Sequence, residues 1–380
     1  MIDTSLSNRV VGRGVWMRFV KSEDLAKGMR LAKPIYNKNG VLLYDRDTKL
    51  TKQGINSIKN FNLIGIYILE PAEPLPPMTD DDVEFERFQT MSVFGLKEDL
   101  EIIISGKKPV NIDNLVKIIA KNYCRKEQKV NFTQNIRSQE DYVYKHCLNV
   151  AILTAMMAVK LKLTAVEIRH VVYAALVHDV GKLTLNLSMT LESMSEGVRN
   201  QISQAEQKGI KIIEDSDYAL DEVKALLREK FKLEMNPSLS TKNNDFSVAS
   251  KILQIAETYD DLTAMKIGEE PTSDVIAVRT LLADTTKYDT QIVGALIDSI
   301  KILYPGICVE LTNGYTGLVI RGNEEDVLKP MILSFTDNNL YNLRDPETYA
   351  YVQIKDIMKS MDKRVVVDKA TIAEYIKKYN

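Results

Sequence analysis

The sequence predicts a mainly helical protein with a small N-terminal α+β module and a C-terminal β-hairpin extension. From Val83 to about Ile302, apolar residues recur at three- and four-residue spacing, the period of helices that bury one face. After Tyr304-Pro305-Gly306 the period changes to two, which is typical of strands. A stretch rich in proline and aspartate precedes the helical region. These observations divide the chain into residues 1–70, 71–82, 83–302 and 303–380.

The composition is that of an ordinary globular chain of 380 residues, 45% hydrophobic and 27% charged. Fifty basic and fifty-two acidic residues give a net charge of −2, which argues against binding a nucleic-acid polymer but not against a local phosphate pocket. The three cysteines have no paired spacing, which favours a reducing compartment. No run approaches the roughly 20 apolar residues of a membrane span. We therefore expect a cytoplasmic protein that does not bind membranes.

Short apolar runs predict the N-terminal module. "LAKPIY" and "VLLY" flank Asn37–Gly40, a hairpin turn in which glycine tolerates positive φ. "TKQGINSIKNFN" predicts a short helix and "IGIYIL" a closing strand. The following "EPAEPLPPMTDDD" contains four prolines and three aspartates and cannot continue a helix or a central strand, so we interpret it as a linker.

Two segments of the helical region resemble capping boxes, in which a hydroxyl and a carboxylate satisfy free backbone amides. "SQED" (138–141) precedes the helix that carries His146, and "TAVE" (164–167) precedes a helix that runs to Gly181. Beyond the bundle, "ICVELTNGYTGLVIRG" predicts two strands around Asn313-Gly314. "TIAEYIKKY" predicts a helix at the end of the chain.

Three of the predicted helices carry side chains suited to a metal ion. An ion that activates water for phosphate-ester cleavage needs nitrogen and carboxylate ligands from separate elements. His146 lies on one helix, His178-Asp179 near the end of a second, and "ILQIAETYDDLTA" supplies Glu257, Asp260 and Asp261 on a third. Lys182 is placed to hold a phosphate oxygen electrostatically.

Each residue also has a structural explanation. An adjacent His-Asp pair that closes an apolar helix is more often a helix cap, and His146 alone is more often a half-buried side chain. His170 lies eight residues before His178, about 80° round the helix axis, and is expected to be structural or exposed. Met156-Met157 and Cys147 are expected to fill the core.

In combination, however, the segments resemble the HD superfamily and, within it, the HD-GYP family of bacterial cyclic di-GMP phosphodiesterases. "HCLNVAILTAMMAVKLKLT" is similar to the family's first ligand helix, "ALVHDVGK" to its HD-x-GK segment and "KILQIAETYDDLTA" to its last ligand helix. The N-terminal module and the β extension also look like segments that accompany such domains. The resemblance implies a helical HD bundle whose metal ligands are His146, His178, Asp179 and Glu257.

The sequence departs from that family at several positions. The next ligand histidine is replaced by Ala205, and the paired histidines before the GYP signature are replaced near Arg228-Glu229. Glu257 stands for an aspartate, Glu269 for an arginine, and Lys182 lacks the usual Lys-Pro after it. With three histidines in the whole chain, a centre of two or three ions cannot be assembled, which leaves one divalent ion such as iron or manganese.

Three functional hypotheses remain open. The first is a catalytically weak or inactive regulatory or scaffold module that still binds a nucleotide. The second is an active one-metal phosphohydrolase on cyclic di-GMP or another nucleotide, with Asp179 and Lys182 as its catalytic residues. The third is a structural helical protein that binds neither metal nor nucleotide. The resemblance also implies a homodimer or a signalling protein partner.

Overall fold

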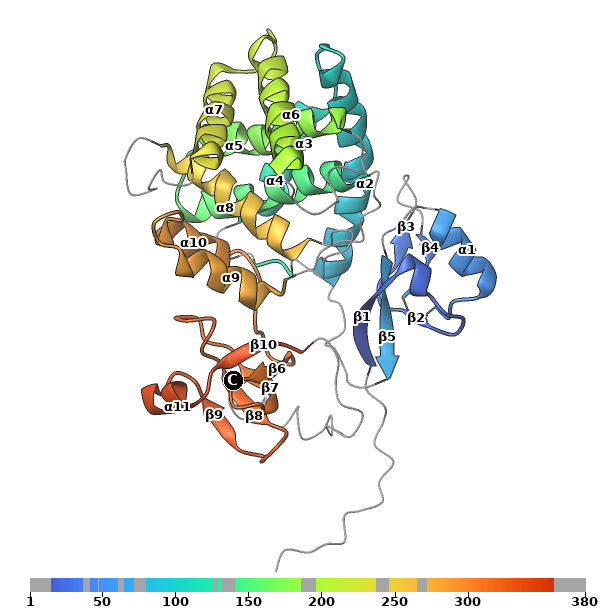
Figure 1. The fold of residues 1–380 in the computed structure, drawn as a ribbon, viewed down its shortest axis with the longest axis vertical. Helices are drawn as coiled ribbons and strands as arrows, with labels where there is room; N and C mark the ends of the chain where they lie inside the picture. Colours follow the sequence, from blue (N-terminus) through green and yellow to red (C-terminus); the bar gives the residue numbers. More distant parts are fainter. Residues whose placement is uncertain are drawn as a thin grey trace, which may run out of the picture.

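The computed structural model describes three regions of the chain: a small N-terminal module, a helical bundle and a C-terminal sheet. Figure 1 shows the module beside α2 (Asp80–Ile104) and the sheet below α9 (Asp274–Ala283) and α10 (Thr290–Ile297). The fold is mainly helical, as predicted. The described residues are 15–36, 42–46, 48–60, 65–71, 80–125, 127, 129–131, 141–185, 196–236, 246–264 and 272–358.

The N-terminal module combines an antiparallel sheet with a short helix. Strand β5 (Gly65–Pro71) is the predicted "IGIYIL" strand and lies between β1 (Val15–Lys21) and β2 (Arg30–Leu31). The remaining elements are η1 (Ser22–Asp24), the paired strands β3 (Ile35–Tyr36) and β4 (Leu42–Tyr44), and the predicted helix α1 (Lys52–Asn60). The expected turn at Asn37–Gly40 lies outside the described residues.

Helix α2 connects the module to the bundle. It begins at Asp80, inside the segment interpreted as a linker, because aspartates are favourable residues in the first turn of a helix. Farther along, the Glu86 carboxylate accepts a hydrogen bond from the Lys33 ammonium of the module. At the other end, the buried Asp99 carboxylate accepts from the amides of Val110 and Asn111 and fixes the turn before α3 (Ile112–Tyr123).

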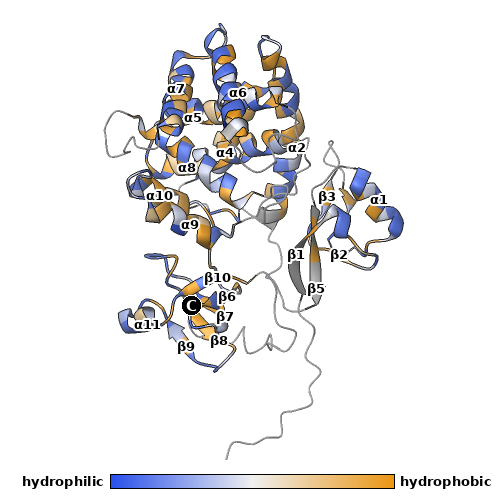
Figure 2. Cartoon of the chain, viewed as in Figure 1, coloured by the Kyte–Doolittle hydropathy of each residue, from blue (hydrophilic) through white to orange (hydrophobic). Residues whose placement is uncertain are grey.

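The bundle is built around α4 (Tyr142–Lys160), nearly all of whose side chains are buried. The remaining elements of the bundle are η2 (Val180–Thr184), α6 (Glu196–Glu214), α7 (Asp221–Met235) and α8 (Val248–Thr263). By length and composition α4 could cross a membrane, but it is a core helix that packs against α2, α3, α8, α10 and α5 (Ala165–Val177). Figure 2 shows hydrophilic and hydrophobic residues alternating along the outer helices α6 and α7.

One of the two predicted capping boxes is confirmed. The Thr164 hydroxyl accepts a hydrogen bond from the Glu167 amide, and the Glu167 carboxylate accepts from the Thr164 amide at 2.7 Å. Of the other box, 138–141, only Asp141 lies within the described residues. Asp141 is the N-cap of α4 and makes no capping hydrogen bond at that position. The predicted pairing of Ser138 with Asp141 stays a prediction, because Ser138 lies outside the described residues.

The C-terminal region is a five-stranded antiparallel sheet, larger than the hairpin that the sequence predicts. Asn313-Gly314 joins the first two strands as predicted, with Gly314 at a φ of +83°. The predicted "TIAEYIKKY" helix lies outside the described residues. The strand order is β10 (Ile354–Ile357), β6 (Cys308–Leu311), β7 (Thr316–Arg321), β8 (Met331–Ser334) and β9 (Leu340–Asn342), with α11 (Pro346–Tyr351) before β10.

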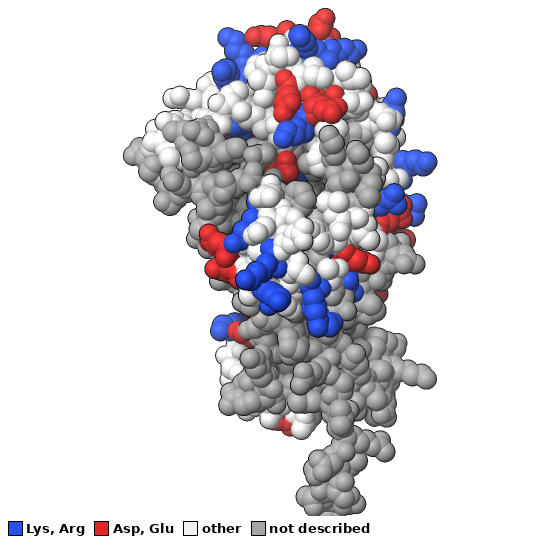
Figure 3. All heavy atoms as spheres, turned by 90° about the vertical axis from the view of Figure 1, so that its right-hand side faces the viewer, with Lys and Arg blue, Asp and Glu red and all other residues white. Residues whose placement is uncertain are grey.

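Charged residues on one face of the molecule are mixed in sign. On the face drawn in Figure 3, lysines and arginines are interspersed with aspartates and glutamates over the helical part. This pattern is what a net charge of −2 leads one to expect.

Candidate metal centre

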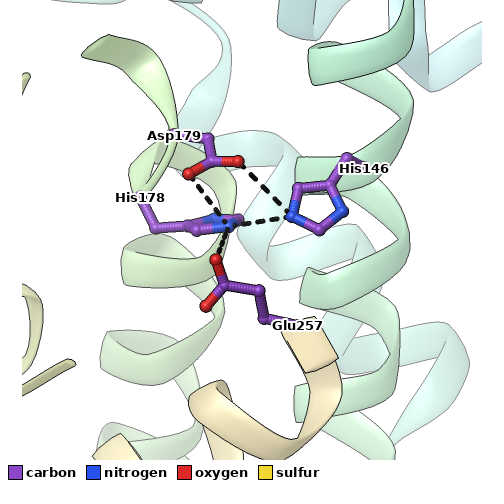
Figure 4. A group of neighbouring side chains, drawn as sticks. All are labelled: His146, His178, Asp179 and Glu257. Carbon is purple, nitrogen blue, oxygen red and sulfur yellow. Dashed lines mark hydrogen bonds and ion pairs between the residues drawn. The ribbon is translucent and has the colours of Figure 1, made fainter. Parts of the chain in front are cut away.

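Four side chains from separate parts of the chain meet inside the bundle (Figure 4). His146 comes from α4, His178 and Asp179 follow α5, and Glu257 comes from α8. Each offers one ligand atom, and these atoms all lie within 4.8 Å of one another. All four residues are buried. The structure therefore brings together the ligand set that the sequence predicts, whereas the role of each residue in binding remains a prediction.

A break in helical geometry lets His178 and Asp179 face the same point. Neighbouring residues on a continuous helix do not share a face. Helix α5, however, ends at Val177, and the chain tightens into the 3₁₀ turn η2 three residues later, at Val180. With its φ of −104° and ψ of 13°, Asp179 lies outside the α-helical region, so its carboxylate turns back toward the imidazole of His178.

The hydrogen bonds of the two imidazoles fix which nitrogens carry protons. The Nδ1 of His178 lies 2.7 Å from the carbonyl oxygen of Ala175, which can only accept, so Nδ1 donates. The Nδ1 of His146 donates in the same way to the Oδ2 of Asp260 at 2.6 Å. The two Nε2 atoms face each other at 3.2 Å. Because the Nδ1 atoms carry the protons, each Nε2 of a neutral ring presents a lone pair. Two lone pairs 3.2 Å apart repel each other unless a proton or a metal ion lies between or beside them.

Asp179 supplies an independent sign of a cation. Its Oδ1 is buried and has no hydrogen-bond partner among the described residues, although it lies 3.5 Å from the Nε2 of His178. A buried carboxylate oxygen without a donor is costly, but it is a good ligand for a hard cation. The donor set of two imidazoles and two carboxylates therefore fits a divalent metal ion. When bound, such an ion would polarise a phosphoryl oxygen or lower the pKa of a water molecule.

Burial affects the two histidines differently. For His178, burial lowers the pKa to about 3, so its imidazole is neutral and available as a ligand. For His146, burial is the largest effect and opposes protonation, but the hydrogen bond that its Nδ1 donates to Asp260 and the charges of Asp261, Asp260 and Asp179 together outweigh it, so the pKa is raised. In the absence of a metal ion, a proton on His146 can thus fill the gap between the two rings. Metal binding would displace that proton.

A chain of hydrogen bonds holds His146 in place. The Oδ1 of Asp260 accepts from the Nδ2 of Asn149 at 3.0 Å, and the Oδ1 of Asn149 accepts from the Nε2 of Gln89 at 2.7 Å. Such partners orient a ligand imidazole and raise its basicity. The sequence pointed to Asp260 but not to Asn149 or Gln89. Asp261 lies at the rim, 4.0 Å from the Nδ1 of His146.

Two lysines contact the carboxylates of the centre. The Nζ of Lys182 lies 2.8 Å from the Oδ2 of Asp179 and 2.9 Å from the Oε1 of Glu206. The Nζ of Lys230 lies 2.9 Å from the Oε1 of Glu257. Sequence reasoning missed Glu206 and Lys230. Burial raises the pKa of Glu257 to about 8, against the opposing effect of the Lys230 ammonium.

The positions at which the resemblance expects further histidines have other contacts. Ala205 packs beside the backbone of Gly181. Arg228 donates from Nε to the Oε1 of Glu214 at 2.5 Å, and the Glu229 carboxylate accepts from Ser247. His170 is half-buried on α5 and is not part of the cluster. Glu269 and most of the segment that follows Lys182, residues 186–195, lie outside the described residues.

Comparison with known proteins agrees with this geometry. Residues 143–262 match the model of the HD domain, and this range includes the four candidate ligands and Asp260. Residues 143–262 are therefore similar to an HD domain.

More distant similarities extend beyond the HD domain. The cyclic di-GMP phosphodiesterase PA4108 of Pseudomonas aeruginosa is 21% identical over 207 residues, which cover 53% of this chain and 49% of PA4108. The chain thus spans about half the length of this relative. Among solved structures, Bd1817, an HDG"Y"P protein from Bdellovibrio bacteriovorus, is 15% identical with a TM-score of 0.36, over 74% of this chain and 99% of Bd1817. The chain therefore has a distant sequence similarity to a cyclic di-GMP phosphodiesterase.

Proposed function

We propose that this protein binds one divalent cation through its HD domain and acts as a regulatory or nucleotide-binding module with weak or no phosphodiesterase activity. The observation that carries the proposal is the convergence of His146, His178, Asp179 and Glu257, with lysine ammonium groups against the same carboxylates. The ligand set supports one ion, and the lysines occupy the space beside it.

Weak activity follows from the groups that the centre lacks. Two-metal phosphoesterases clamp the attacking and leaving oxygens between their ions, and Ala205 offers no side-chain ligand for a second ion. The Lys182 ammonium, which the sequence assigns to the phosphate, is held by Asp179 and Glu206. Losing one transition-state contact typically costs about 3–4 kcal/mol, so two losses reduce the rate by several orders of magnitude.

The proposed ligand is a cyclic dinucleotide. The basis is the distant similarity to PA4108, whose name states that it is a cyclic di-GMP phosphodiesterase. A nucleotide phosphate bound beside the centre would compete with Asp179 and Glu206 for the Lys182 ammonium. We further propose that the signal reaches a second copy of the chain or a signalling protein partner.

Metal analysis beside activity and binding assays tests the proposal. Anaerobically purified protein should contain about one iron or manganese ion per chain, bind cyclic di-GMP in calorimetry, and show slow or no hydrolysis with added manganese. His178→Ala should lose the ion, whereas the control His170→Ala, outside the cluster, should keep it. Two ions per chain, or rapid hydrolysis that His178→Ala abolishes, would contradict the proposal. If the chain binds neither metal nor nucleotide, the proposal is also contradicted, and the hypothesis of a purely structural helical protein is supported.

The alternative is an active single-metal phosphohydrolase. It is favoured by the preorganised ligand set, in which the two Nε2 atoms and the unsatisfied Oδ1 of Asp179 already face one another. It predicts metal-dependent hydrolysis of cyclic di-GMP or another nucleotide. That hydrolysis should be lost in His178→Ala and strongly reduced in Lys182→Met, since Asp179 and Lys182 would be its catalytic residues.

A further inference from the structure

The centre contains more buried carboxylates than one metal ion needs. Asp179, Glu206, Glu257 and Asp260 are 1%, 5%, 6% and 0% exposed, and Glu234 lies at the rim. Burying several negative charges together is expensive unless cations accompany them. The fold must therefore place cationic side chains beside these carboxylates to balance their negative charge.

Lys230 is the most deeply buried of these cations. It lies on α7, and its side chain is 4% exposed. Its Nζ lies 2.9 Å from the Oε1 of Glu257 and 2.9 Å from the Oε2 of Glu234. The same Oε1 of Glu257 lies 3.7 Å from the Nε2 of His178. One carboxylate oxygen thus lies close to both an imidazole nitrogen and an ammonium group.

Lys182 supplies the second positive charge beside the buried carboxylates. Its Nζ contacts Asp179 and Glu206 and lies 4.0 Å from the Oε1 of Glu257. Metal binding requires ionised carboxylate ligands and neutral imidazoles. In that state the four buried carboxylates and the two ammonium groups have a summed charge of −2, which one divalent ion neutralises. A second divalent ion would leave the buried cluster with a surplus of two positive charges.

Resting on the proposed one-ion centre, we propose that the Lys230 ammonium takes the place of a second metal ion. It contacts the same Oε1 of Glu257 that lies 3.7 Å from the Nε2 of His178, so a second ion sharing this carboxylate would have to compete with the ammonium group for it. It thereby limits the centre to a single cation. Without that ammonium, Glu257, Glu206 and Glu234 become a set of hard oxygen ligands with excess negative charge, which is the environment that manganese or magnesium prefers.

Lys230→Met tests this role because it keeps the length of the side chain and removes the charge. Protein loaded with Mn²⁺ and dialysed should contain about one ion per chain in the wild type and about two in Lys230→Met. The electron paramagnetic resonance of the variant should show a spin-coupled manganese pair. Lys232→Met, on the exposed face of the same helix, is the matched control and should retain one ion. Lys230→Arg should also retain one, since the charge is kept.

The outcomes separate this inference from the function on which it rests. Zero or two ions in the wild type would contradict the one-ion centre itself. One ion in both the wild type and a folded Lys230→Met, with unchanged affinity and uncoupled manganese spectra, would overturn only the role of Lys230. Circular dichroism checks folding. If Lys230→Met does not fold, Lys230→Gln replaces it with the same expectation, because its amide still donates to Glu257.

Discussion

Replacing Gly209 by alanine should force α6 away from the turn that carries Lys182. A Cβ on Gly209 would lie 2.5 Å from the backbone nitrogen of Gly181 and 2.7 Å from its Cα. Real Cβ atoms essentially never come within 3.0 Å of such atoms. Because the obstacle is backbone, no side-chain rotation can relieve it, and the two elements must separate by about 0.5 Å or more.

The magnitude follows from two opposing effects. In an open helix, glycine to alanine is stabilising by about 0.5–1 kcal/mol. Overpacking a rigid contact costs about 1–3 kcal/mol. We expect the second effect to win, with Gly209→Ala less stable than the wild type by about 1–2 kcal/mol. The 2.9 Å contact between Lys182 on the turn and Glu206 on α6 should lengthen as well.

Urea denaturation followed by far-ultraviolet circular dichroism measures the change. The matched control is Gly95→Ala on α2, whose Cβ would meet no described atom within 4 Å and which should be more stable by about 0.5–1 kcal/mol. The two substitutions are chemically identical but should shift the midpoint in opposite directions. A Gly209→Ala midpoint equal to or above that of Gly95→Ala would refute the close approach of α6 and η2.

Three further predictions concern a cap, a ligand orientation and a titration. Thr164→Ala should lower the free energy of unfolding by about 1 kcal/mol in urea titrations, because α5 loses its capping box; an unchanged midpoint would contradict it. Asp260→Asn should weaken manganese binding about 10–100-fold in competition titrations, because His146 loses its anionic partner; equal affinity would argue against that role. Burial raises the pKa of Asp274 to about 6 from an unfolded value of 3.8, against the opposing hydrogen bond from Tyr259. The folded state therefore keeps a proton that the unfolded state releases, so stability should fall by up to about 3 kcal/mol as the pH rises from about 4 to about 6. Asp274→Asn should flatten that dependence, and an unaltered pH profile would show that another group titrates.

The ligand set was predictable because each ligand lies within a short, recognisable segment. His178-Asp179 closes an apolar helix, and Glu257 opens an acidic run on another. The geometry that joins them was not predictable, since the bond between His146 and Asp260 spans 114 residues of chain. Only packing of α4 against α8 sets that distance.

The missed residues nevertheless left a signal in the sequence. Lys230 follows Val223, Leu226 and Leu227 at the three- and four-residue spacing of the buried face of α7, and Leu233 continues that face. A lysine on such a face needs a buried carboxylate, but the sequence alone could not say that Glu257 provides it. Strands β8 to β10 were missed because runs of three or four residues are too short to show a period of two.

Two residues one turn apart on helix α2 contact the small N-terminal module and the hydrogen-bond chain of the candidate metal centre. Glu86 contacts Lys33 of the module, and Gln89, one turn farther on, begins the hydrogen-bond chain through Asn149 to Asp260. Rotation of α2 about its own axis would therefore move both contacts at once. A molecule that shifted the module would therefore displace the Asp260 carboxylate that orients the His146 ring, and the N-terminal module would be coupled to the candidate metal ligands.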